Sequence, residues 1–105
     1  MLETMPQLTT LIVDDELQSR LLIKTLLLKN FPQFTIAEAE TVNAAKEKIM
    51  QMHPDLLFLD VQMRDETGFD LLDQVGTVDF GIIFTTAHSE YALKAFRIPL
   101  ESNQR

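Results

Sequence analysis

The chain has 105 residues, no cysteine and a formal net charge of −7. Its length suits a single domain, and the absence of cysteine excludes a disulfide framework, a thiol nucleophile and a thiolate metal site. The acidic balance and the scattered basic residues argue against nucleic-acid binding, and no apolar run approaches the roughly 18 residues of a membrane span. Because the first residues also lack the basic region of a signal peptide, we expect a cytoplasmic protein with no nucleic-acid or membrane partner.

The first half of the chain predicts two strand–helix pairs. Residues 8–13 are apolar and rich in β-branched side chains, as is typical of a buried strand. Leucines then recur at helical spacing over residues 16–29. Residues 34–38 form a second short strand, and either Thr41 or Asn43 caps the helix that follows it.

The second half repeats the pattern. Residues 55–60 have an entirely apolar interior between their two terminal aspartates, which indicates a strand buried on both faces of a parallel sheet. A loop with Gly68 as its turn residue leads to a helix over 69–75, and a strand over 80–86 precedes a helix over 89–96. Four strand–helix pairs joined by short connections predict an α/β fold with a doubly wound parallel sheet.

Acidic residues follow two of these strands. Asp14 and Asp15 come directly after the first strand, and Asp60 ends the third. Strands one and three are neighbours in a doubly wound order, so these carboxylates should share one pocket at the carboxyl edge of the sheet. A lone aspartate there more often caps a helix, but three together repel one another and favour a hard divalent cation, Mg²⁺. A carboxylate beside such a cation can act as a nucleophile toward a phosphoryl donor.

Four stretches carrying these residues resemble a known family. They are residues 11–16, 57–63, 67–72 and 82–87. Together they are similar to the receiver domain of bacterial two-component response regulators, and residues 86–96 resemble receivers joined to LytTR-type output domains. The resemblance implies a flavodoxin-like, CheY-like sheet and a role as a phosphoprotein in phosphorelay signal transduction.

The resemblance also implies residue roles. Asp60 would accept a phosphoryl group from a sensor histidine kinase, as an aspartyl-phosphate. The implied Mg²⁺ ligands are Asp14, Asp15, Asp60 and the backbone carbonyl of Gln62. Thr86 would be the switch hydroxyl that approaches the phosphoryl group, and Ala87 the small neighbour that leaves room for it. Such a chain is not an enzyme beyond self-catalysed phosphotransfer and dephosphorylation.

The resemblance fades at the end of the chain. We expect an incomplete receiver domain over residues 1–98 and a divergent tail over 99–105, with the family's fifth strand and helix missing. The lysine that pairs with the phosphoryl group would fall just beyond Arg105, so phosphotransfer should be impaired. The strand over 80–86 would become a sheet edge, and we expect self-association as a dimer. Helix leucines that we expect to be partly uncovered are Leu17, Leu21 and Leu28.

Two other functions compete with a phosphate-accepting receiver. One is a protein-interaction module that keeps the fold without being phosphorylated. The other is a magnesium-dependent phosphatase with an aspartate nucleophile, which needs a second acid two residues later. Gln62 stands at that position after Asp60, so we rank the phosphatase last.

Overall fold

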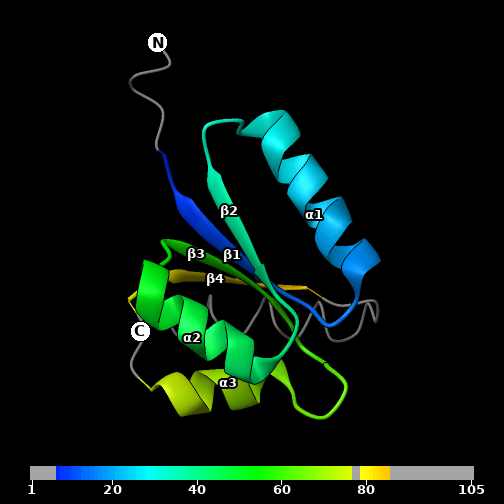
Figure 1. Cartoon of the computed structure of the whole chain (residues 1–105), viewed down its shortest axis with the longest axis vertical. Coiled ribbons are helices and arrows are strands. Elements are labelled where there is room, and N and C mark those ends of the chain that lie inside the picture. Colours follow the sequence, from blue (N-terminus) through cyan, green and yellow to red (C-terminus); the bar gives the residue numbers. More distant parts are fainter. Residues whose placement is uncertain (1–6, 77–78, 86–105) are drawn as a thin grey trace, which may run out of the picture.

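The computed structural model describes residues 7–76 and 79–85, and in them four parallel strands form one sheet in the order β2-β1-β3-β4 (Figure 1). The strands are β1 Thr9–Val13, β2 Thr35–Ala39, β3 Leu56–Asp60 and β4 Gly81–Thr85. The helices are α1 Leu17–Asn30, α2 Val42–Met52 and α3 Gly68–Val75. This order confirms the predicted doubly wound sheet and makes β1 and β3 neighbours.

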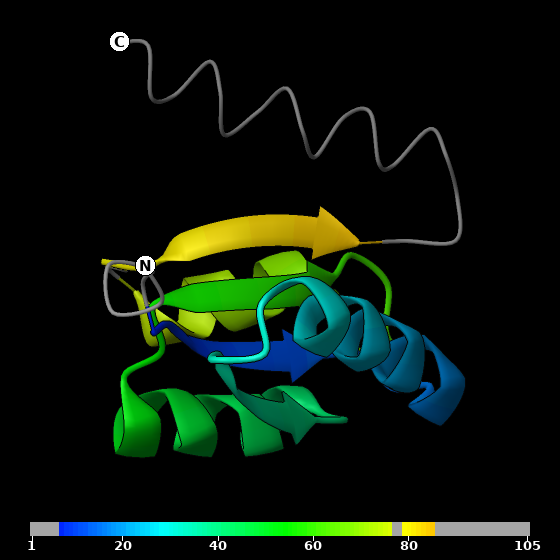
Figure 2. The ribbon, with the colours of Figure 1, turned by 90° about the horizontal axis from the view of Figure 1, so that it is seen from above.

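Strand register determines which residues meet at the carboxyl edge of the sheet. Val13, the last residue of β1, has Ala39 and Leu59 as its Cα partners on β2 and β3. Asp60 pairs in turn with Thr85 of β4. Figure 2 shows the strands lying alongside one another, so the loops after β1 and β3 leave the sheet side by side.

The helices cover the two faces of the sheet, with α1 on one side and α2 and α3 on the other (Figure 1). Alternate residues of β1 and β3 enter the core beneath α2 and α3: Leu11, Val13, Leu57 and Leu59. Ile12 packs on the opposite face with Leu27 of α1 and with Phe34. Both faces of these central strands are therefore apolar, which explains the unbroken hydrophobic run predicted as a doubly covered strand.

Side-chain caps fix where two of the helices begin. The Thr41 hydroxyl accepts a hydrogen bond from the Ala44 N–H at 3.0 Å, so Thr41 and not Asn43 caps α2. Thr67 and Asp70 form a reciprocal capping box at the start of α3. These bonds satisfy donors that the first helical turn leaves without partners.

The structure corrects the predicted role of Gly68. This residue is the first of α3 and not a turn residue in the preceding loop. A Cβ atom at Gly68 would lie 2.4 Å from the carbonyl oxygen of Asp60 and 2.8 Å from Cγ of Leu59. Glycine is needed because α3 begins in close contact with the end of β3.

Other boundaries differ from prediction by one residue, as with β2, which covers 35–39 and not 34–38. The predicted helix over 89–96, the tail over 99–105, and both Thr86 and Ala87 lie outside the described residues. The end of the predicted fourth strand falls there too.

The exposed surface of α1 is unusually rich in leucine. Leu17, Leu21 and Leu28 are exposed, as expected, with Leu17 at 65% of its full accessible area. Leu22 and Leu26 are exposed as well. No helix in the described part of the chain has the length and hydropathy needed to cross a membrane.

Candidate metal centre

The three predicted acids do meet in space. Asp14 and Asp15 lie in the loop between β1 and α1, and Asp60 is the last residue of β3. Each offers a carboxylate oxygen, and these atoms lie within 4.8 Å of one another. Asp14 and Asp60 are buried, with 5% and 8% of their surfaces accessible. The cluster forms because parallel neighbours β1 and β3 end at the same edge.

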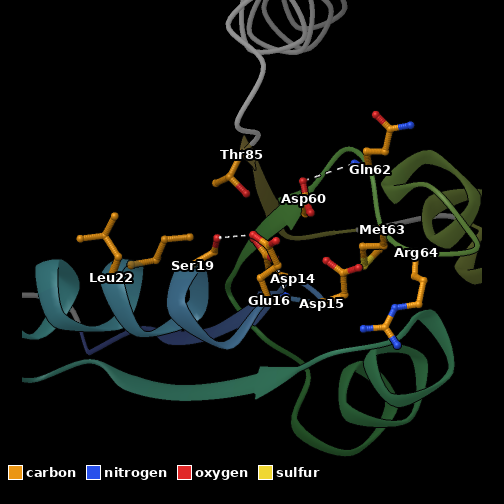
Figure 3. Close-up of a pocket in the computed structure, with 11 residues that line it drawn as sticks. Asp14, Asp15, Glu16, Ser19, Leu22, Asp60, Gln62, Met63, Arg64 and Thr85 are labelled. Carbon is orange, nitrogen blue, oxygen red and sulfur yellow. Dashed lines mark hydrogen bonds between the residues drawn. The ribbon is translucent and has the colours of Figure 1, made fainter.

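Backbone N–H groups orient two of the carboxylates. Oδ1 of Asp14 accepts a hydrogen bond from the Glu16 N–H at 2.9 Å, at the entry to α1. Oδ1 of Asp60 accepts one from the Gln62 N–H at 3.3 Å (Figure 3). Each carboxylate keeps its second oxygen available for another ligand.

The site is electrostatically unfavourable for bare carboxylates. Burial, together with the charge of Asp14, raises the pKa of Asp60 to about 6, and the hydrogen bond from Gln62 opposes this rise. Burial also raises the pKa of Asp14, with the charges of Asp15 and Glu16 adding to the effect. Among the described residues, no lysine or arginine forms an ion pair with these three acids. The charge of Arg20 opposes the rise at Asp14 without cancelling it, and an all-oxygen donor set with this excess of negative charge fits a hard divalent cation such as Mg²⁺.

The carboxylates open into a pocket of about 680 Å³ between α1 and the loop after β3. Ser19 and Leu22 of α1 form one wall, and Gln62 and Arg64 lie on the opposite side (Figure 3). The volume can hold a hydrated cation together with a phosphoryl group. The chemistry available here is therefore that of a carboxylate nucleophile beside a cation site.

A short closed loop holds Gln62 at this pocket. Gln62 and Thr67 form an isolated antiparallel β-bridge. Two backbone hydrogen bonds flank it: the Met63 N–H donates to the carbonyl of Glu66, and the Gly68 N–H donates to the carbonyl of Val61. The loop after β3 is thus pinned at both ends. The role of the Gln62 carbonyl as a metal ligand stays a prediction.

Sequence reasoning missed Thr85. The last residue of β4 lines the pocket beside Asp60 (Figure 3). Its hydroxyl is buried and forms no hydrogen bond within the described part of the chain. The predicted switch hydroxyl, Thr86, is the next residue and lies outside the described part of the chain, so its role stays a prediction. The position of Thr85 beside Asp60 follows from the β3–β4 register, which pairs these two residues and cannot be read from the sequence.

Comparison with known proteins identifies the family. The family model for the response regulator receiver domain matches residues 10–101. The chain belongs to the response regulator receiver family. Receivers of this family act in two-component signalling and are not classical enzymes. They generally bind Mg²⁺ at an acidic pocket, receive phosphate from sensor histidine kinases and often dimerise.

Curated relatives place this receiver with the LytT and LytR regulators. The chain is 44% identical over 91 residues to the sensory transduction protein LytT of Enterococcus faecalis, covering 84% of the chain and 37% of that relative. It is 41% identical over 93 residues to LytT of Bacillus subtilis, covering 87% and 39%. The chain thus spans less than two fifths of the length of these relatives.

Solved receiver structures share the fold. A response regulator of the LuxR family from an Aurantimonas species superposes with a TM-score of 0.69 at 24% identity, covering 88% of this chain and 69% of that one. The N-terminal domain of a response regulator receiver protein from Methanoculleus marisnigri gives a TM-score of 0.71 at 24% identity, covering 79% and 69%. These likenesses support the fold assignment alone.

Proposed function

We propose that Asp60 accepts a phosphoryl group from the phosphohistidine of a sensor histidine kinase. The observation that carries this proposal is the convergence of Asp14, Asp15 and Asp60, whose carboxylate oxygens lie within 4.8 Å. A cluster this close needs a cation, and the pocket beside Asp60 has room for the donor phosphoryl group. The family relationship supplies the class of donor.

The transfer is a displacement at phosphorus. A carboxylate oxygen of Asp60 forms the new O–P bond while the P–N bond to the donor imidazole breaks, and the imidazole nitrogen keeps the electron pair. Asp14, Asp15, Asp60 and the Gln62 carbonyl would hold Mg²⁺, which when bound neutralises charge on the carboxylates and on the phosphoryl oxygens. The Gln62 N–H keeps one Asp60 oxygen oriented, and this leaves the other oxygen to attack.

We also propose the predicted switch at the end of β4. Thr86 would donate its hydroxyl to the phosphoryl group and Ala87 would leave space for that group. Support comes from Thr85, the preceding residue, which lies in the pocket wall next to Asp60. A new donor hydrogen bond at this edge would bias a two-state element of the domain.

The same proposal includes the bounds of the receiver unit, its cellular location and its partners. We place the receiver unit over residues 1–98 and treat 99–105 as a separate tail, in a cytoplasmic protein whose partners are a sensor histidine kinase and a second copy of the chain. The exposed leucines of α1 support self-association.

Intact-mass spectrometry tests the phosphoacceptor role. The protein is incubated with a phosphoramidate donor in Mg²⁺ or in EDTA, and the Asp60→Asn variant is the matched control because it keeps side-chain size and loses the nucleophile. We expect one phosphoryl adduct on the wild-type protein in Mg²⁺ only, and none on the variant. An unlabelled wild-type protein that still binds Mg²⁺ would instead favour the non-phosphorylated interaction module. An adduct retained by the variant would place phosphorylation elsewhere.

A further inference from the structure

We propose that Arg20 is a positioning residue that holds the acid loop in its cation-binding geometry. The proposal rests on the function proposed for Asp60 and concerns the same site. Arg20 lies in the second turn of α1, and its side chain is only 12% exposed. It touches none of the reacting atoms and acts through the backbone of Asp14.

The guanidinium of Arg20 bridges two elements. Nη1 donates to the carbonyl oxygen of Asp14 at 2.7 Å, and Nε donates to Oε1 of Glu38 on β2 at 3.0 Å. These are short, charge-assisted bonds from a planar fork whose donor directions are fixed. Glu38 therefore anchors the arginine to the sheet, and the arginine in turn anchors the acid loop.

Asp14 is consequently held on three sides. Its N–H donates to the carbonyl of Ala39 at 3.1 Å, its carbonyl accepts from Arg20, and its carboxylate accepts from the N–H of Glu16. The peptide between Asp14 and Asp15 is planar, so fixing its carbonyl also fixes the backbone from which the Asp15 carboxylate projects. Arg20 thereby sets the placement of two of the three proposed ligands relative to Asp60.

A simple charge effect predicts the opposite result from positioning. A guanidinium whose charge acts on the Asp14 carboxylate also repels an incoming cation, so its removal by charge alone should strengthen Mg²⁺ binding. If Arg20 positions the loop, its removal weakens binding, because the ligands must be ordered when the cation arrives. The sign of the change in affinity distinguishes the two roles.

Lys24 provides the matched control. It lies one turn further along α1 and its Nζ contacts the same carboxylate, at 3.4 Å from Oε2 of Glu38. It makes no bond to Asp14. Lys24→Gln therefore removes one positive charge from the same cluster without releasing the acid loop.

Calorimetric titration measures the Mg²⁺ affinity of the wild-type protein and of Arg20→Gln, Arg20→Lys and Lys24→Gln. Thermal unfolding in EDTA shows whether each variant is folded. We expect both Arg20 variants to bind Mg²⁺ more weakly, on the order of 10-fold. Arg20→Lys keeps the charge, but one ammonium group cannot reproduce the two-point fork. Lys24→Gln should keep the wild-type affinity within about 2-fold. Labelling of Asp60 should slow in parallel with the loss of affinity.

Unchanged or tighter Mg²⁺ binding by a folded Arg20 variant overturns the positioning role, as does an equal loss in Lys24→Gln. If Arg20→Gln does not fold, Arg20→Lys decides the question. A wild-type protein that binds Mg²⁺ without labelling contradicts the proposed function and leaves the comparison of affinities intact, so the two failures are distinguishable.

Discussion

Asp60 is buried and faces two other carboxylates. Keeping its charge in this position should lower the free energy of unfolding by a measurable amount. The pKa of its carboxyl is 3.8 when unperturbed and about 6 in the folded protein. Between these values the folded state binds more protons than the unfolded state, so the free energy of unfolding falls as pH rises. A shift of this size corresponds to about 2–3 kcal/mol once Asp60 is fully ionised.

We therefore expect Asp60→Asn to stabilise the protein in EDTA at pH 7.5 by about 2–3 kcal/mol. The gain should shrink as pH falls through 6 and vanish only below about pH 3, where Asp60 is protonated in both the folded and the unfolded state. Thermal and urea unfolding at several pH values measure this. A variant that is less stable than wild type at pH 7.5 would contradict it.

Proton competition should also control cation binding. Because the pKa of Asp60 is about 6, a falling pH replaces a ligand charge with a proton before it affects ordinary aspartates. We expect Mg²⁺ affinity to weaken at least 10-fold between pH 7.5 and pH 5. Titration calorimetry at the two pH values checks this, with Ca²⁺ as a second oxygen-binding cation. Equal affinity at both values would exclude a titrating ligand at this site.

The sequence predicts residues whose role depends on their place at a strand end. Asp14, Asp15 and Asp60 each follow an apolar run, and the order of elements then brings them together. Arg20 and Thr85 were missed because their roles depend on tertiary contacts. Arg20 matters because the second turn of α1 passes the carbonyl of Asp14, and Thr85 because of its register with Asp60.

At the scale of elements, β3 and α3 meet in close contact beside the site, at Gly68. A methyl group at Gly68 would meet the Asp60 backbone and the Leu59 side chain. Backbone cannot yield as a flexible side chain does, so the helix start and the end of β3 must move apart. Any such movement also displaces the Asp60 carboxylate.

We expect Gly68→Ala to destabilise the protein by about 1–3 kcal/mol and to weaken Mg²⁺ binding. Gly81→Ala is the matched control, because its new Cβ would lie 3.2 Å from the tip of the Leu56 side chain. That variant should stay within about 1 kcal/mol of wild type. Urea unfolding and calorimetry report the two effects. Similar losses in both variants would contradict a specific role for the β3–α3 junction.

The existence of α2 was predicted correctly, and Thr41, one of its two predicted caps, is the residue that caps it. Gly68 was misjudged because the sequence does not distinguish a glycine required by a turn from one required by a close contact. Strand ends differed by a residue because pairing decides them, as with Ala39, which extends β2 through its pairing with Val13.

At the scale of the whole molecule, the exposed leucines of α1 are the feature that most favours self-association. Leu22 is 61% exposed, and four other leucines of the same helix are exposed as well. Covering one such side chain is worth about 1.5–3 kcal/mol. Covering several of these leucines with a second copy would favour association against its entropic cost.

We expect the apparent mass of the protein to rise with concentration and Leu22→Glu to lower it toward a monomer. Met50→Glu is the matched control, since Met50 is as exposed but lies on α2, and it introduces the same charge. Size-exclusion chromatography with light scattering measures the mass. A monomer at all concentrations, or equal dissociation by both variants, would show that the α1 leucines do not drive association.

The position of β1 between β2 and β3 has a consequence for the order of folding. Thr9 and Asp55, which are hydrogen-bonded at the start of these central strands, lie 46 residues apart in the chain. This long closure must occur before Asp14 and Asp15 can meet Asp60, so no early, local intermediate contains the complete acid cluster. A divalent cation should then bind only after the central pairing has formed. It would slow unfolding and leave the folding rate unchanged if that pairing forms after the transition state.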